Sequence, residues 1–399
     1  MSRLDRGRSA WLAAALAGLV LCGSAVPPAA AAHVPARAAA AAMPAASGDD
    51  ARATREDIAA AIATAIVADM SPAQRASAVV MGHIGGTDPE TLGSYVEDGG
   101  LGGFILMGSN VPRTREQLRG VTDALDGEDG AMPPLVAIDQ EGGVVSRLRW
   151  DDGPAGAELQ GRTPADTRAA FEERGRLLEA AGISVNFGVV ADVGTSTSGF
   201  IRPRTLGGDA GSAAERVAAA VQGERGHAFS TLKHFPGHGA APGDSHTLIP
   251  QTRMPAAQWR ADHAPPFEAG IDAGAELVMT GHLRFTATDD APASLSPAWY
   301  GILRDDLGFE GVAITDDLGM LRSSGEERYA DPVRNAVAAV AAGADMVLMV
   351  AGSDARTATD MAAGIAAEVD AGRLEEAATR VVALRVQASG LLDDPAFDG

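Results

Sequence analysis

The sequence predicts an α/β protein folded as a single (β/α)8 barrel of the TIM type, and three observations support this. Apolar runs of strand length alternate with alanine-rich helical stretches from about residue 55 onward. Polar residues follow the ends of several runs, where such a barrel places its active site. The chain has 399 residues, 46% of them hydrophobic, which is enough for one barrel with a full core.

The strands are predicted from runs that lack alternation, which is typical of strands covered on both faces. Before three of these runs a helical stretch ends in Ala-Gly, and glycine can adopt the left-handed conformation that ends a helix. The eight runs are Val79–Gly82, Gly103–Met107, Leu135–Ile138, Ile183–Val190, Ser230–His234, Leu277–Thr280, Val312–Thr315 and Met346–Val350. A doubly wound open sheet is the alternative, although it would leave the eighth strand and the closing helix without a role.

The first 32 residues resemble an export signal, with three arginines, an apolar run over Trp11–Leu21 and a small-residue stretch. That run is short for a membrane span, which needs about 20 apolar residues, so an uncleaved anchor is the lesser alternative. Cys22 stands where a bacterial lipoprotein carries its acylated cysteine, but Leu21 is not the small residue usual before it. A secreted and a lipidated form both stay open.

The remaining boundaries follow from composition. Residues 33–54 are rich in Ala, Pro and Ser and predict a flexible tether, residues 55–390 the barrel, and residues 391–399 a short acidic tail. The balance of 32 basic and 53 acidic residues, a net charge of −21, argues against nucleic acid and anionic membranes as partners. The single cysteine excludes a disulfide scaffold and a multi-cysteine metal site.

Candidate catalytic residues stand at the predicted strand ends, whereas the strand starts carry no comparable charge. The polar residues at these ends are Asp139, Asp192, Lys233, His234, His282, Asp316 and Asp317. Lys233 is the one lysine in a chain that otherwise uses arginine. This one-sided distribution predicts an enzyme.

The segment from Lys233 to His246 holds three of the eight histidines. A metal site of His234, His238, Asp244 and His246 is possible but disfavoured, because no His-Glu-x-x-His pattern is present. His238 is expected to be a packing residue. Asp244 lies two residues before His246, so its carboxylate can orient the imidazole and leave the other nitrogen for proton transfer.

Asp316 and Asp317 are adjacent on a strand and must point to opposite faces. We expect Asp316 to face the barrel mouth and Asp317 to cap the following helix. After Asp139, two glycines allow the backbone to approach a ligand closely. Arg147 and Arg204 are candidate ligand clamps.

Several segments resemble the family 3 glycoside hydrolases, and among them the bacterial β-N-acetylglucosaminidases of cell-wall turnover. They fall in the family's order over most of residues 70–350. The segments are Ala137–Gly143, Val185–Val193, Lys233–Gly239 with Asp244–His246, Val278–His282, Pro292–Pro297 and Gly311–Met320.

The resemblance implies a retaining β-glycosidase in which Asp316 is the nucleophile and His246, backed by Asp244, is the acid/base. It also implies that the sugar is held by Asp139, Arg147, Arg204, Lys233 and His234. No metal or other cofactor is implied. Two departures, Val144 for an arginine and Ala240 for an acidic residue, remove no catalytic group.

The implied substrate is terminal β-linked N-acetylglucosamine on peptidoglycan-derived muropeptides or short amino-sugar oligosaccharides. The sequence leaves open a phosphorylase on the same scaffold and a sugar-binding lipoprotein without turnover. We expect a monomer outside the cytoplasm, with no protein partner.

Overall fold

The computed structural model describes residues 54–127, 132–195 and 199–393. The predicted export signal, Cys22 and all but the last residue of the predicted tether lie outside the described residues. That last residue, Thr54, caps helix α2 (Arg55–Asp69), because its side chain accepts a hydrogen bond from the Asp57 N–H. At the other end, Leu391–Asp393 form a short 3-10 helix in which Leu392 is buried.

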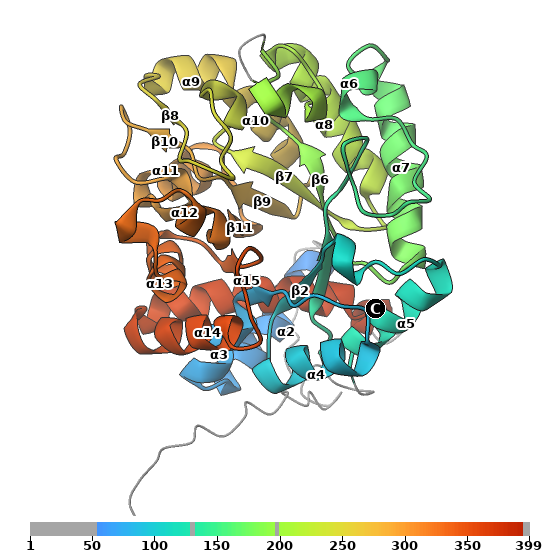
Figure 1. Cartoon of the computed structure of the whole chain (residues 1–399), viewed down its shortest axis with the longest axis vertical. Coiled ribbons are helices and arrows are strands. Elements are labelled where there is room, and N and C mark those ends of the chain that lie inside the picture. The colour runs from blue at the N-terminus through green and yellow to red at the C-terminus, as the bar shows by residue number, and fades with distance from the viewer. Residues whose placement is uncertain (1–53, 128–131, 196–198, 394–399) are drawn as a thin grey trace, which may run out of the picture.

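Within these ranges, eight parallel strands close into a barrel in the order β1-β12-β11-β9-β7-β6-β3-β2 (Figure 1). The strands are β1 (Val80–Gly82), β2 (Gly103–Leu106), β3 (Leu135–Ile138), β6 (Val185–Val190), β7 (Phe229–Phe235), β9 (Leu277–Thr280), β11 (Val312–Asp317) and β12 (Met346–Leu348). Each predicted run overlaps one strand, so the barrel is confirmed. The open-sheet alternative is wrong, because β1 pairs with both β2 and β12.

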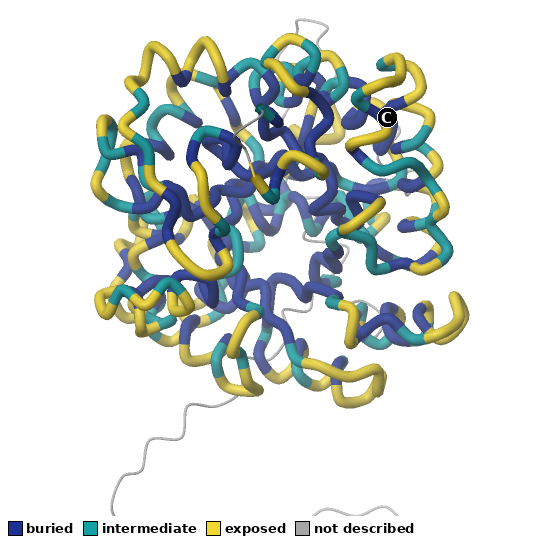
Figure 2. Tube along the Cα trace, turned by 45° about the horizontal axis from the view of Figure 1, so that its top comes forward, coloured by how far each residue is buried: buried dark blue, intermediate teal, exposed yellow. Residues whose placement is uncertain are grey.

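The helices surround the barrel, and Figure 2 shows buried backbone as an inner ring with exposed positions toward the periphery. Besides α2 they are α3 (Pro72–Ala78), α4 (Pro89–Gly99), α5 (Arg115–Leu125), α6 (Gly156–Leu159), α7 (Pro164–Ala180), α8 (Ala210–Glu224), α9 (Ala256–Asp262), α10 (Ala264–Asp272), α11 (Pro297–Gly301), α12 (Leu318–Ser323), α13 (Pro332–Ala342), α14 (Thr357–Glu368) and α15 (Ala371–Ala388). None of the described helices is long and apolar enough to cross a membrane.

The predicted helix-ending glycines lie where the pattern placed them. Gly182, Gly274 and Gly343 have φ values of 72°, 90° and 135°, a region that favours glycine. Each follows a helix and precedes a barrel strand. The Ala-Gly signal therefore marks real element boundaries.

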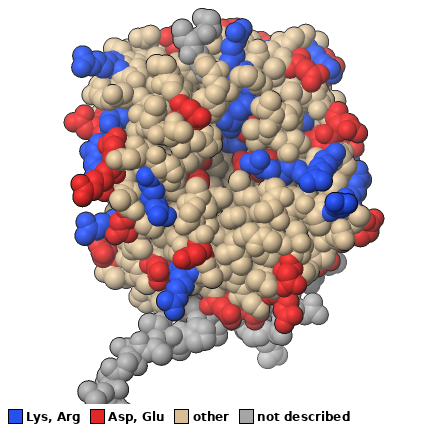
Figure 3. Space-filling view, viewed as in Figure 1, with Lys and Arg blue, Asp and Glu red and all other residues tan. Residues whose placement is uncertain are grey.

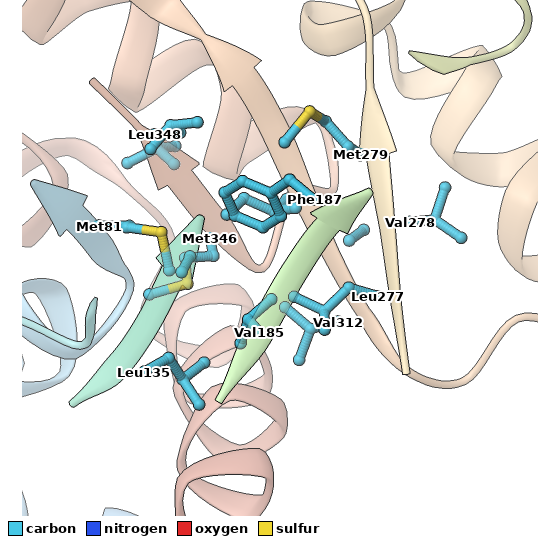
Figure 4. Close-up of a cluster of buried hydrophobic side chains, with 14 of the residues drawn as sticks. Met81, Leu135, Val185, Phe187, Leu277, Val278, Met279, Val312, Met346 and Leu348 are labelled. Atoms are coloured by element: carbon cyan, nitrogen blue, oxygen red, sulfur yellow. The ribbon is translucent and has the colours of Figure 1, made fainter. Parts of the chain in front are cut away.

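The strands are apolar on both faces because each side packs against a different layer. Figure 4 shows Leu277 and Met279 of β9 directed toward Phe187 and the other side chains that fill the barrel, while Val278 points to the other side of the strand. All four side chains are buried. Such packing removes the alternating pattern that a half-exposed strand would show.

The sequence predicted that the strand starts carry no comparable charge, and this prediction is wrong. Asp345 directly precedes β12 and is fully buried. It pairs with Arg304, with Arg373 at 2.7 Å and with Arg380 at 3.2 Å, and it accepts the Ala313 N–H. We call these four charged residues the Asp345 cluster. It lies at the amino-terminal end of the barrel, opposite the mouth.

Candidate active site

The mouth of the barrel is lined by segments that follow the strands. A hairpin of β4 (Gln140–Gly142) and β5 (Val145–Ser146) follows β3, and a 3-10 helix, η2 (Gly199–Arg204), lies between β6 and α8. In the same view as Figure 1, Figure 3 shows a hollow near the centre of the face, with acidic and basic side chains around it.

Five charged side chains form one partly buried network at this mouth, which we call the Lys233 network. Lys233 Nζ lies 2.9 Å from Asp139 Oδ1 and 2.7 Å from Glu141 Oε1. Arg147 donates to the other Asp139 oxygen at 3.2 Å. Arg204 binds Glu141 through two hydrogen bonds, at 2.9 and 2.7 Å. The network brings together four of the predicted sugar-holding residues.

The electrostatics of this network keep Asp139, Glu141 and Lys233 charged. Burial opposes ionisation of Asp139, but the charges of Lys233 and Arg147 lower its pKa to about 2. Glu141 likewise has a lowered pKa, because Lys233 and Arg204 outweigh its burial. Burial favours loss of the Lys233 proton, yet the two carboxylates raise its pKa. The site therefore offers fixed charges that can hydrogen-bond polar groups of a ligand.

Glu141 and Gln140 were missed as functional candidates, although both lie in the segment that carries the resemblance. Gln140 is fully buried, and its Oε1 accepts the N–H groups of Arg147 (2.8 Å) and Leu148 (2.9 Å). Its amide nitrogen donates to Asp151 at 2.7 Å. These bonds fix the hairpin and so position Arg147. The feature of the sequence that could have identified them is that these two polar residues directly precede two glycines.

His234 is oriented by the buried carboxylate of Asp192. The two side chains lie 2.7 Å apart through His234 Nδ1, and Arg204 Nη2 lies 3.3 Å from Nε2. A proton on Nδ1 is therefore donated to Asp192, and Nε2 faces the arginine. Burial opposes ionisation of Asp192, but the adjacent His234 and His238 lower its pKa to about 2.

Asp316 and Asp317 make different contacts, and the capping role expected of Asp317 is confirmed. Asp317 caps α12 by accepting the Gly319 N–H at 2.8 Å, and it also accepts the N–H groups of Val350 and Ala351. Asp316 lies among the mouth residues. Burial raises the pKa of its carboxyl, but nearby charges, chiefly His234 and His282, outweigh this and hold the pKa below its ordinary value.

Asp316 also differs from Asp139 in its partners. Its Oδ1 accepts the backbone N–H of Asp317 at 2.8 Å. Within the described ranges it forms no ion pair with a lysine or arginine, whereas Asp139 pairs with Lys233 and Arg147. Asp316 is thus an ionised carboxylate that is not neutralised by direct contact.

His246 stands at the rim of the mouth rather than inside it. Its Nδ1 lies 2.6 Å from Asp244 Oδ1, which confirms the predicted pairing, and its side chain is 61% exposed. No hydrogen bond or ion pair joins it to Asp316 in the described part of the chain. Its ring lies 6.0 Å from that of Phe200, centroid to centroid. Phe200 was not foreseen from the sequence.

Two of the four residues weighed as a metal site have partners outside that set, and the other two, Asp244 and His246, pair with each other. His234 pairs with Asp192, and the ring of His238 lies 2.9 Å from the Ser245 hydroxyl. Among the residues that the structure describes, no group of three or more His, Cys, Asp or Glu side chains is arranged to hold a metal ion. His238 is buried, as expected of a packing residue, but it also makes a specific hydrogen bond.

Comparisons with known proteins agree with this geometry. The chain is 35% identical over 262 residues to a β-hexosaminidase of Alkalilimnicola ehrlichii, covering 62% of this chain and 73% of that protein. A β-N-acetylhexosaminidase structure from Beutenbergia cavernae matches with a TM-score of 0.70 and 31% identity, over 80% of this chain and 99% of that chain.

A glycoside hydrolase family 3 β-N-acetylglucosaminidase from Paenibacillus sp. FPU-7 has a TM-score of 0.75 and 28% identity, over 81% of this chain. This chain spans 63% of the Paenibacillus chain. The glycosyl hydrolase family 3 N-terminal domain matches residues 76–388, which include the whole barrel and every residue of the site. The protein is therefore a glycoside hydrolase, and it belongs to glycosyl hydrolase family 3.

Proposed function

We propose that the protein is a retaining exo-β-N-acetylglucosaminidase that removes terminal β-linked N-acetylglucosamine from peptidoglycan-derived muropeptides or short amino-sugar oligosaccharides. The activities named for its relatives support the amino-sugar substrate. The observation that carries the mechanism is the Asp316 carboxylate, which is ionised, lies at the mouth and has no lysine or arginine partner within the described residues.

In the proposed first step, Asp316 attacks the anomeric carbon and forms a covalent glycosyl-aspartate while the glycosidic bond breaks. The leaving oxygen takes a proton from His246, whose other ring nitrogen is held by Asp244. In the second step His246 accepts a proton from a water molecule whose oxygen attacks the anomeric carbon, and the bond to Asp316 breaks, which releases the sugar and restores the carboxylate. An imidazole suits both steps, because its ordinary pKa of about 6.5 lies near neutrality.

The Lys233 network supplies the proposed sugar-binding groups. Asp139 can accept hydrogen bonds from sugar hydroxyls, and Lys233, Arg147 and Arg204 can donate them. His234 lies beside Arg204 and extends the same surface. Hydrogen bonds to charged groups are stronger than neutral ones, so each contact would help to orient the terminal sugar for attack by Asp316.

The test is release of N-acetylglucosamine from purified cell-wall fragments, followed by mass spectrometry, with and without inorganic phosphate. We expect free N-acetylglucosamine in both conditions, with its β configuration retained when first released. A strict need for phosphate, with the sugar 1-phosphate as product, would establish the phosphorylase instead. Binding of the fragments without any release would establish a sugar-binding protein.

We further propose that the protein acts outside the cytoplasm, on the basis of the signal-like pattern of residues 1–32. Cell fractionation of the full chain tests this. Incorporation of labelled fatty acid that is lost in Cys22→Ala would indicate the lipidated form. Protein in the culture medium without label would indicate the secreted form.

A further inference from the structure

The loop that carries His246 has one exposed part and one buried part. The side chains of His246 and Asp244 are 61% and 47% exposed, so solvent surrounds much of this pair. Ser245, between them in the sequence, is buried. Its hydroxyl lies 2.9 Å from His238 Nε2. The loop is therefore anchored through the residue next to the imidazole and not through the imidazole itself.

Hydrogen bonds through Asp192 connect the anchor, His238, to His234, which is proposed to bind the sugar. The His238 backbone N–H donates to Asp192 Oδ1, and the other oxygen of Asp192 lies 2.7 Å from the His234 ring. Asp192 and His238 are both buried. Burial lowers the pKa of His238 to about 4. Its ring is therefore neutral at neutral pH, and the hydrogen bond to Ser245 joins two uncharged groups.

Phe200 provides a second support for the same loop. It lies in η2, the short helix that ends at Arg204. Its ring is edge-to-face with His238, with centroids 4.9 Å apart, and nearly so with His246 at 6.0 Å. The Arg204 guanidinium lies over the same ring at 5.9 Å. One aromatic ring thus contacts the acid/base candidate, its anchor and a sugar-binding arginine.

We infer that Phe200 and Ser245 are positioning residues that anchor the loop of His246 beside Arg204. This inference rests on the proposed function of His246. Neither residue needs to touch the substrate, since each acts through the imidazole. General acid–base catalysis contributes about 10²–10⁴-fold, and a misplaced acid loses part of it, so we expect losses of about tenfold.

The test uses two aryl N-acetyl-β-glucosaminides, one with a good and one with a poor leaving group. Phe200→Leu and Ser245→Ala should each lower kcat/KM about tenfold for the poor leaving group and less than twofold for the good one. Phe200→Tyr and Ser245→Thr, which keep the ring and the hydroxyl, should retain most of the activity. Ser212→Ala, which removes a hydroxyl at the start of α8, is the matched control and should change nothing.

A double-mutant cycle separates positioning from general damage to the site. In the His246→Ala background, Phe200→Leu and Ser245→Ala should have no further effect on kcat for the good leaving group, where deglycosylation limits turnover. Equal losses for both leaving groups, or losses that multiply with that of His246→Ala, would overturn the inference while leaving the proposed function intact. Full activity of His246→Ala itself on the poor leaving group would instead overturn the proposed acid/base role.

Discussion

The two ends of the barrel carry buried charge clusters that are built from similar groups and differ in what remains accessible. In the Asp345 cluster, one fully buried carboxylate is surrounded by three arginines whose side chains are 17–27% exposed. Arg304 also donates to the Phe309 and Gly311 carbonyls, and Arg373 to that of Ala344. These contacts tie α15 and the loops around β11 to the start of β12.

In the Lys233 network, three cations share two carboxylates, and the network stays in contact with the mouth. The side chain of its carboxylate Asp139 is 18% exposed, whereas that of Asp345 is fully buried. Beside it stands Asp316, ionised and without a cationic partner among the described residues. A buried ion cluster with every bond satisfied stabilises the fold or replaces apolar packing. A cluster of similar groups whose carboxylate a ligand can reach is suited to binding and catalysis.

The largest effect that tests this contrast is on turnover at the mouth. Asp316→Asn removes the proposed nucleophile but keeps the shape of the side chain. We expect turnover of an aryl N-acetyl-β-glucosaminide to fall by about a thousandfold or more. The thermal unfolding temperature and circular dichroism spectrum should remain near those of the unmodified protein. Retention of full activity would contradict the nucleophile assignment.

A smaller loss at the mouth is expected for His246→Ala, and it should depend on the leaving group. With a poor leaving group the rate should fall by about 10²–10⁴-fold, because the departing oxygen needs a proton. With a good leaving group, kcat/KM should fall much less. The comparison of kcat/KM for the two substrates measures this, and equal losses would argue against proton donation.

The opposite outcome is expected for Asp345→Asn at the other end of the barrel. Three arginines would lose their shared countercharge, and breaking a buried ion pair costs about 3–5 kcal/mol. Chemical denaturation should show this loss in the free energy of unfolding. At a temperature where the variant stays folded, kcat should be unchanged. A large fall in kcat without a loss of stability would mean that the two ends are coupled.

The smallest expected effect is on the pH dependence of the free energy of unfolding. Burial raises the pKa values of Glu224 and Glu276 to about 7, and both carboxylates lie against Ser230 at the start of β7. A raised pKa in the folded state means that stability is fully present below about pH 4.5 and is lost as the pH rises through 7.

Glu224→Gln should therefore flatten the fall in unfolding free energy between pH 5 and 8, by up to about 3 kcal/mol. Denaturation at several pH values measures this, and an unchanged slope would exclude Glu224 as the source. At the mouth the sign is reversed. Asp139 and Asp192 have pKa values lowered to about 2, so their contribution is lost only as the pH falls from about 4 toward 2.

Much of the site could be predicted because its residues stand next to strands that are easy to recognise. Asp139, Lys233 and Asp316 each follow or end an apolar run, and a barrel gathers strand ends at one mouth. Asp317 was predictable as a cap because adjacent strand residues face opposite ways. Asp244 and His246 were predictable because they are two residues apart.

The contacts that were missed join residues far apart in the chain. Phe200 meets His246 across 46 positions, from a segment with no periodic pattern of its own. Asp345 pairs with arginines on η5 (Ile302–Asp306) and α15. The sequence around β12 therefore does not show which cations neutralise it. Glu141 likewise finds its partners, Lys233 and Arg204, on other segments of the chain.

The sequence by itself determined the eight-stranded barrel, the end at which the candidate site residues gather and the family, because these depend on apolar runs, helix-ending glycines and local motifs. Only the tertiary structure decided which charges pair, which stay reachable by a ligand and where His246 stands relative to Asp316. The physical reason is that ion pairing and burial depend on distances between segments that only the closed barrel brings together.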